Sequence, residues 1–235
     1  MIPFPAGKFH IIYADPPWAY DQKAIPTKAG KYKNAAAADH YPTMSPAELA
    51  ALPIADLAEE NCVLFLWATF PKLEVALETG KAWGFWYRTL GFSWIKTYAQ
   101  CGRPKLGFGS YAKSNCEVCL FFRRGHVGRL LQGKPTTDPK DCLRVISNKV
   151  SSVVMSPIGR HSAKPPEVRE RIVELFGDVS RIELFARSSA PGWAHWGNEV
   201  IHGQDATRAA GSEGDRSGGL ENVEAPAIPE CHPEG

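Results

Sequence analysis

Asp15-Pro16-Pro17-Trp18 is a short stretch whose groups could act together on a substrate. Asp15 offers a carboxylate acceptor. The two prolines have a fixed φ and no N–H, so the backbone there is stiff and presents only carbonyl acceptors. Trp18 adds a flat apolar face. Several acceptors beside a stacking surface suit a planar ring that carries an amino group, such as a nucleobase. The alternative interpretation is a strand followed by a Pro-Pro turn with a core tryptophan.

The chemistry that such acceptors favour is attack by the amino group itself. An exocyclic amine is a poor nucleophile because its lone pair is delocalised into the ring. Acceptors such as the Asp15 carboxylate and a proline carbonyl would draw electron density toward the nitrogen and stabilise the positive charge that develops there. The motif therefore favours a site that makes an aromatic amine attack an electrophile.

The elements around this motif alternate between strands and helices. We expect strands at residues 9–14, 62–68, 86–97, 116–122 and 181–186, and helices at the capping box that begins at Ser45, at 71–83 and at 164–176. This alternation predicts a single Rossmann-like α/β domain over residues 6–202, with a mainly parallel sheet and helices on both faces. Segments 19–44, 99–114 and most of 123–160 are expected to be loops. Asp15 directly follows its strand, where ligands of open α/β sheets bind.

Residues 203–235 are rich in Gly, Ser, Glu and Pro, so we expect a disordered acidic tail. The tail holds two basic and seven acidic residues, which leaves 25 basic and 18 acidic residues before it. That excess suits a polyanionic partner, although an ordinary basic enzyme would show it too. No apolar run reaches the roughly 18 residues of a membrane span, and no secretory leader is visible. We therefore expect a cytoplasmic protein.

The six cysteines raise the question of a metal site. Cys116 and Cys119 form a C-x-x-C pair, but they lie in an expected strand, where residues three apart point to opposite faces. No second pair completes a set of four ligands. Reduced, structural thiols and no metal are the expectation.

Several stretches together resemble one known family. Ala14–Trp18 after an apolar strand resembles the catalytic motif of amino-methyltransferases, and its Trp form resembles the MT-A70-like family of N6-adenine methyltransferases. NCEVCLFFRRG resembles the family's E-x-C-L strand, RHSAKPPEVRERIVELFGDVSRIELFAR its H-S-x-K-P helix and next strand, and GWAHWGNEV its closing W-G-N-E/Q segment. These blocks follow the family's order over roughly residues 8–200.

The resemblance implies transfer of a methyl group from S-adenosylmethionine to adenine N6. It places the target base and its amino group at Asp15, Pro16, Pro17 and Trp18, with Lys113 as a further substrate contact. It assigns cofactor binding to Asp15, His161, Ser162, Lys164, Arg187, Asn198 and Glu199. In that assignment Lys164 faces the cofactor carboxylate and the last two residues bind its ribose hydroxyls.

Each assignment has a plainer alternative. Lys164 could simply begin a helix, Asn198 and Glu199 could cap a strand end, and His161 could be idle in a polar loop. Arg187 could pair with a carboxylate such as Glu183. The chain has no glycine-rich F-x-G-x-G, and only eight residues precede Phe9, where some family members have a segment that holds the cofactor adenine. The cofactor assignment therefore depends on the resemblance.

The substrate is expected to be DNA rather than RNA, because a short single-domain member of this kind resembles a bacterial, phage or prophage enzyme. Lysines at 23–33 and basic residues such as Arg103, Lys105 and Arg123 could contact phosphates. Two other classes stay open. One is a catalytically silent nucleic-acid-binding subunit, and the other is an enzyme that methylates another amine, such as cytosine N4 or a protein glutamine. A homodimer or a partner subunit is left open as well.

Overall fold

A seven-stranded sheet forms the centre of the computed structural model, which describes residues 2–19, 43–107, 111–131, 134–135, 143–159 and 163–198. Across the sheet the strands are β11 (Ala194–Trp196), β10 (Arg181–Leu184), β1 (Phe9–Ala14), β2 (Ala58–Ala68), β4 (Cys116–Arg124), β3 (Trp86–Thr97) and β9 (Val153–Pro157). Neighbouring strands are parallel except where β4 pairs with β2 and β3. The expected mainly parallel α/β sheet is confirmed.

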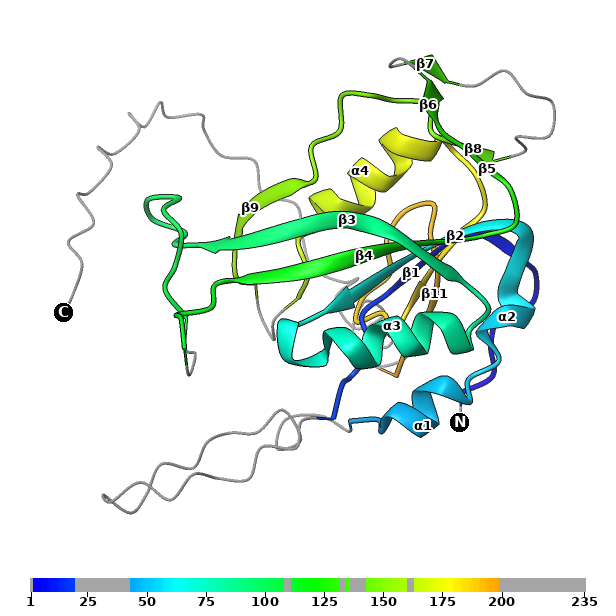
Figure 1. Ribbon diagram of the computed structural model, residues 1–235, viewed down its shortest axis with the longest axis horizontal. Coiled ribbons are helices and arrows are strands. Elements are labelled where there is room, and N and C mark those ends of the chain that lie inside the picture. The colour runs from blue at the N-terminus through cyan, green and yellow to red at the C-terminus, as the bar shows by residue number, and fades with distance from the viewer. Residues whose placement is uncertain are drawn as a thin grey trace, which may run out of the picture.

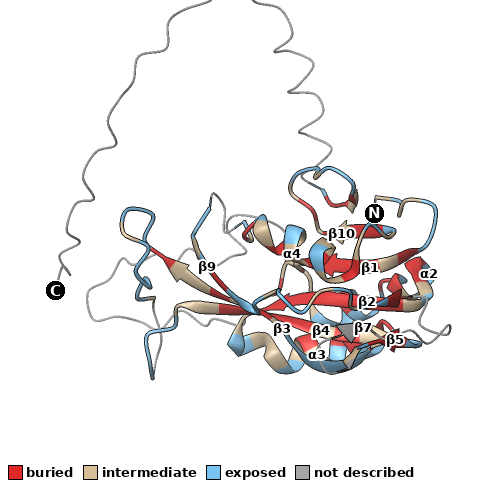
Figure 2. Cartoon of the chain, turned by 90° about the horizontal axis from the view of Figure 1, so that it is seen from above, coloured by how far each residue is buried: buried red, intermediate tan, exposed pale blue. Residues whose placement is uncertain are grey.

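The central strand β2 has a continuous apolar run from Cys62 to Ala68 because both of its faces are covered there. Along β2, Leu64 and Leu66 belong to one buried cluster, whereas Phe65 and Trp67 belong to the other. Side chains alternate between the faces of a strand, so a continuous apolar run feeds two cores at once. Figure 2 shows β1 and β2 as buried strands in the interior of the molecule.

Helices cover both faces, as expected (Figure 1). One face carries α1 (Pro46–Ala50), α2 (Ile54–Leu57) and α3 (Leu73–Ala82), which follows a 3-10 turn (Phe70–Lys72). The other face carries α4 (Glu167–Phe176), whose buried stripe is Val168, Ile172 and Phe176. That spacing of four residues places the three side chains on one side of the helix. We call these the α3 face and the α4 face.

The predicted start of α1 is confirmed in detail. The Ser45 hydroxyl accepts the backbone N–H of Glu48, and the Glu48 carboxylate accepts the backbone N–H of Ser45. This reciprocal capping box satisfies two N–H groups that a helix end leaves without partners. Gly84, just beyond the end of α3, has a φ of 84°, a region that glycine enters without steric cost.

The element boundaries differ from expectation in four places. β2 begins at Ala58, four residues before the apolar run starts, and α2 and β11 were not expected. The strand β9 lies in a segment that we expected to be mostly loop. As an edge strand it buries Val154 and exposes Val153 and Met155, and its apolar run ends at Met155, much shorter than the run of β2.

Short strands account for more of that same segment. They are β5 (Val127–Gly128), β6 (Leu130–Leu131), β7 (Lys134–Pro135) and β8 (Leu143–Arg144), paired two by two. The expected tail at 203–235, the lysine-rich stretch at 23–33 and most of the expected loop at 19–44 lie outside the described residues. No helix in the described ranges is long and apolar enough to cross a membrane.

Candidate active site

The segment Asp15–Trp18 leaves β1 at the carboxyl edge of the parallel strands, as expected from the sequence. The Trp18 N–H donates to the Pro16 carbonyl at 2.9 Å, and the Met44 N–H donates to the Pro17 carbonyl at 2.8 Å. Both proline carbonyls therefore accept one hydrogen bond from the protein itself. A carbonyl oxygen has two lone pairs, so each can accept one more from a substrate.

The Trp18 ring packs into the core on the α3 face. Only 6% of Trp18 is exposed, and its indole Nε1 donates to the Trp67 carbonyl at 3.1 Å. This packing agrees with the alternative interpretation of the sequence, in which Trp18 is a core residue at a Pro-Pro turn. Its stacking on a substrate ring stays a prediction. What the structure provides is a rigid anchor that fixes the two prolines before it.

Lys164 reaches across the sheet edge to the motif from the segment before α4. Its Nζ lies 2.6 Å from Asp15 Oδ2 and 3.3 Å from Glu117 Oε2 on β4. The same ammonium lies over the Trp67 ring, 5.5 Å from its centroid. Asp15 and Lys164, which are 149 positions apart in the sequence, thus form one partly buried ion pair. They are two of the residues that the sequence pointed to.

A second lysine completes a row of alternating charges. Lys96 Nζ lies 2.6 Å from Glu117 Oε1, so the row runs Asp15, Lys164, Glu117, Lys96. Burial alone would raise the pKa of Glu117, but the two lysines outweigh it and lower that pKa below its ordinary value. Burial alone would likewise lower the pKa of Lys164, but Asp15 and Glu117 raise it. Glu117 and Lys164 are therefore both held ionised at neutral pH.

Aromatic and thiol groups form an apolar floor under this row. The Trp67 Nε1 donates to the Tyr13 hydroxyl at 2.7 Å, and the Trp94 Nε1 donates to the Ser156 carbonyl at 2.8 Å. Burial raises the pKa of the Tyr13 hydroxyl and of the Cys119 thiol well above their ordinary values, so both are neutral. Electrostatic interactions are stronger in such a low-dielectric setting than in water.

The end of β10 turns sharply toward β11. Phe185 has a φ of 59°, which is uncommon for a bulky residue, and its ring packs edge-on against Trp196. A Cβ on Gly197 would come within 2.2 Å of the Ala186 carbonyl oxygen, so only glycine fits beside that strand end. This close approach places Arg187 and Asn198 just beyond the ends of adjacent strands. Arg187 is half-buried and Asn198 is exposed.

Glu183 was a possible partner of Arg187, but it forms an ion pair with Arg169 of α4 at 2.8 Å. Burial, against the effect of Arg169, raises the pKa of Glu183, and the charge of Asp15 adds to the rise. Trp196 is buried in the core on the α3 face and Trp193 in the core on the α4 face. Lys113 is exposed in the segment between β3 and β4. His161, Ser162 and Glu199 lie outside the described residues.

Sequence reasoning missed Glu117 and Lys96 as members of the site. The signal was present, because an acidic residue in the apolar stretch Cys116–Phe122 is rarely buried without a partner. Glu117 is 7% exposed. Its lysine partner could not be identified from spacing, since it comes from the neighbouring antiparallel strand.

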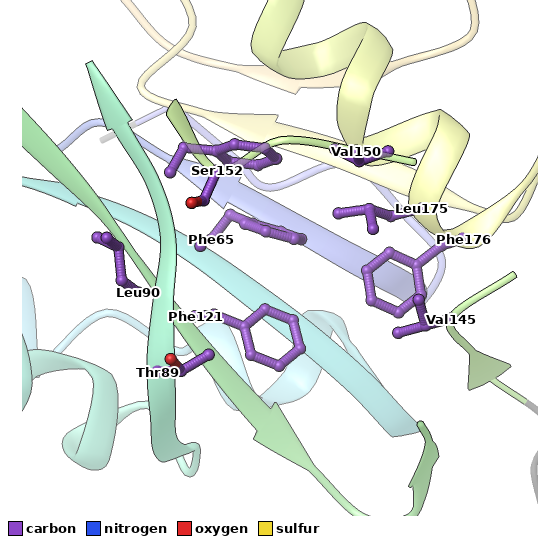
Figure 3. A pocket seen from close by; sticks show the side chains of 11 residues that line it. Phe65, Thr89, Leu90, Phe121, Val145, Val150, Ser152, Leu175 and Phe176 are labelled. Atoms are coloured by element: carbon purple, nitrogen blue, oxygen red, sulfur yellow. The ribbon is translucent and has the colours of Figure 1, made fainter. Parts of the chain in front are cut away.

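The described residues hold no group of three or more His, Cys, Asp or Glu side chains suited to a metal ion. Cys62 and Cys119 are buried free thiols, and Cys116 is a half-buried one. A cavity of about 190 Å³ does open on the α4 face, but it is lined by apolar side chains such as Phe65, Phe121 and Phe176 (Figure 3). It lies at the far end of α4 from Lys164, away from the charged row.

The mainly parallel sheet and the polar site at its carboxyl edge define a Rossmann-like methyltransferase domain. The family model described as MT-A70 matches residues 9–199. The chain therefore belongs to the MT-A70 family.

Named relatives agree with this membership. The chain is 32% identical over 206 residues to the type II methyltransferase M.MunI of Mycoplasma sp, which covers 83% of this chain and 79% of that protein. It is 27% identical to the human N(6)-adenine-specific methyltransferase METTL4 and to the human N(6)-adenosine-methyltransferase catalytic subunit METTL3. Those matches cover 82% and 83% of this chain but only 38% and 28% of the human proteins.

Proposed function

We propose that this chain transfers a methyl group from S-adenosylmethionine to the N6 amino group of adenine in nucleic acid, with DNA preferred to RNA. The observation that carries the proposal is the ion pair of Asp15 and Lys164 at the end of β1, inside an intact Asp-Pro-Pro-Trp motif. Family membership supports the reaction type.

The residues at the strand ends fit the cofactor by their donor and acceptor types. S-adenosylmethionine carries an amino acid end with one ammonium and one carboxylate, and Asp15 beside Lys164 offers the complementary pair at 2.6 Å. Asn198, exposed beyond β11, offers an amide for the ribose hydroxyls. When bound, the cofactor would supply an electrophilic methyl group: the amino nitrogen would displace S-adenosylhomocysteine from it and then lose one proton to solvent.

The chain itself contributes acceptors and rigidity. The Asp15 carboxylate and a proline carbonyl accept the two N–H groups of the target amine, hold the nitrogen in line and stabilise its growing positive charge. The anchored turn between Pro16 and Trp18 keeps those acceptors in place. Positioning of this kind can supply on the order of 7–11 kcal/mol of rate acceleration.

A basic turn beside the site supports a polyanionic substrate. The Tyr98 N–H donates to the Arg103 carbonyl at 2.9 Å, and the Lys105 N–H donates to the Lys96 carbonyl at 2.8 Å. The exposed side chains of Arg103 and Lys105 are thus held next to the charged row, where phosphates could bind. DNA is favoured because the type II methyltransferase relative is matched over most of its length, whereas METTL3, named for adenosine, is matched over 28%.

The decisive experiment offers labelled S-adenosylmethionine with unmethylated duplex DNA, single-stranded DNA and RNA side by side. Product nucleosides are separated by mass spectrometry, and Asp15→Ala is the control variant. Label in N6-methyladenine from DNA is the expected result. If N6-methyladenine is labelled only in RNA, the substrate is RNA and not DNA. Nucleic acid binding without transfer to any substrate indicates a silent subunit and overturns the proposal.

A further inference from the structure

The Asp15 oxygen that the target amine needs already has a partner. Lys164 Nζ lies 2.6 Å from Asp15 Oδ2, the length of a short charge-assisted hydrogen bond. An ammonium and an aromatic amine are both N–H donors, so they compete for that carboxylate. A substrate amine can use Asp15 fully only if Lys164 has another anion to hold it.

Glu117 supplies that second anion. Its Oε2 lies 3.3 Å from Lys164 Nζ, longer than the distance to Asp15 but within reach of a small shift of a flexible side chain. Only 12% of the Lys164 side chain and 9% of the Glu117 side chain are exposed, so water screens this attraction weakly. The lysine therefore lies between two carboxylates on different strands.

Lys96 sets how strongly Glu117 attracts Lys164. It binds the other oxygen of the same carboxylate at 2.6 Å and offsets part of its charge. Lys96 contacts the Trp94 ring as well, 5.1 Å from its centroid, which holds its ammonium over β3. The two lysines share one carboxylate, so a stronger attraction of Glu117 to one lysine weakens its attraction to the other.

We propose that Glu117 and Lys96 are positioning residues that control how far Lys164 occupies Asp15, and thereby how well Asp15 accepts the target amine. This inference rests on the proposed function. Removing the charge of Glu117 leaves Asp15 as the one carboxylate of this row that attracts Lys164, so the lysine occupies the acceptor more. Removing the charge of Lys96 strengthens the attraction between Glu117 and Lys164, which draws Lys164 away from Asp15. The two variants therefore act in opposite directions, although each removes one ion pair from the same row.

The test measures kcat, KM for nucleic acid and cofactor Kd in Glu117→Gln, Lys96→Met and the double variant. Glu117→Gln is expected to lower kcat/KM for nucleic acid about ten-fold, the range of one charge-assisted hydrogen bond, and to change cofactor Kd less than about three-fold. Lys96→Met is expected to raise kcat/KM a few-fold. In the Glu117→Gln background Lys96→Met is expected to have no effect, because it acts only through Glu117.

The controls separate this role from mere stabilisation. Glu78→Gln and Lys81→Met remove the same charges from the exposed surface of α3. Circular dichroism and melting temperature report folding. Lys96→Met remains informative if Glu117→Gln does not fold, since it removes charge only from the far end of the row. A kcat/KM within two-fold of wild type in Glu117→Gln, or an equal loss in both single variants, overturns the inference.

A binding measurement needs no methyl transfer and keeps the two proposals apart. Two all-thymine oligonucleotides are titrated into each variant. One carries a single adenine, and the other carries at that position the unsubstituted base purine, which lacks the amino group. The preference for adenine over purine is expected to shrink about ten-fold in Glu117→Gln and to persist in Lys96→Met. If wild type transfers no methyl group yet shows this pattern, the proposed function fails and the inference holds. If wild type methylates adenine and the preference is the same in all variants, the inference fails alone.

Discussion

The two ends of α4 lie against regions of opposite character on the same face of the sheet. Before its first turn, Lys164 joins Asp15 and Glu117 in a row of charges. At its last turn, Leu175 and Phe176 line an apolar cavity of about 190 Å³ (Figure 3). A ten-residue helix separates these regions by about 15 Å. The difference shows that the apolar hollow on this face is a packing feature, whereas the charged row lies where the strands end.

The physical reason is the direction of the strands. At the carboxyl edge, β1 and β3 end and the antiparallel β4 begins, so Asp15, Lys96 and Glu117 come from different strands to one place. At the other end this face carries apolar strand residues such as Phe65 of β2, Phe92 of β3 and Phe121 of β4. Four substitutions test whether the charged end governs activity and the apolar end governs stability.

Asp15→Ala has the largest expected effect. Removal of the acceptor should lower methyl transfer on the order of 1,000-fold, the upper range for one preorganised electrostatic contact. The comparison requires that this variant keep its fold. Turnover at several time points, with circular dichroism on the same samples, checks both statements, and near-normal transfer would remove Asp15 from the mechanism.

Phe65→Ala tests the apolar end. Phe65 is 1% exposed and its ring contacts Phe92, Phe121 and Phe176. Truncation enlarges the cavity and should lower the free energy of unfolding by about 3 kcal/mol, with kcat changed less than two-fold. Urea unfolding and turnover below the melting temperature measure the two quantities. A large loss of kcat in folded protein would couple the two ends and break the comparison.

Asn198→Ala tests the outer part of the candidate cofactor site. Loss of one hydrogen bond to a ribose hydroxyl should raise cofactor Kd by up to about ten-fold and slow the chemical step less. Calorimetric titration gives the Kd, and single-turnover kinetics gives the rate of transfer. A slower step with unchanged Kd would place Asn198 outside the cofactor pocket.

Glu117→Gln sharpens the comparison through pH. The folded-state pKa of Glu117 is lowered, so its ionised form contributes stability above its ordinary pKa of 4.5 that is lost as pH falls through the folded value. The variant should therefore have a flatter decline of unfolding free energy on the acid side. Glu183 has a raised pKa, so its contribution to the unfolding free energy changes with pH in the opposite direction. That contribution should be the same in the variant and in the wild type. Phe65→Ala should lower the unfolding free energy equally at every pH, without changing its slope against pH.

Much of the fold followed from local patterns in the chain. The apolar run from Cys62 to Ala68 indicated a doubly buried strand, and the spacing of Ser45 and Glu48 indicated a helix start, because both signals depend on neighbours in sequence. The edge strand β9 was missed because its apolar run, Val153–Met155, is short and is followed at once by Ser156 and Pro157.

The sequence by itself determined the motif at Asp15, the family and the place of the site after the first strand. Those conclusions needed only residue types in a fixed order. Tertiary structure alone decided that Lys164 holds Asp15 and that Glu117 and Lys96 continue the row, since these residues come from four separate segments. It decided as well that Trp18 is a core anchor. Contacts of this kind depend on strand order and register, which only the folded sheet defines.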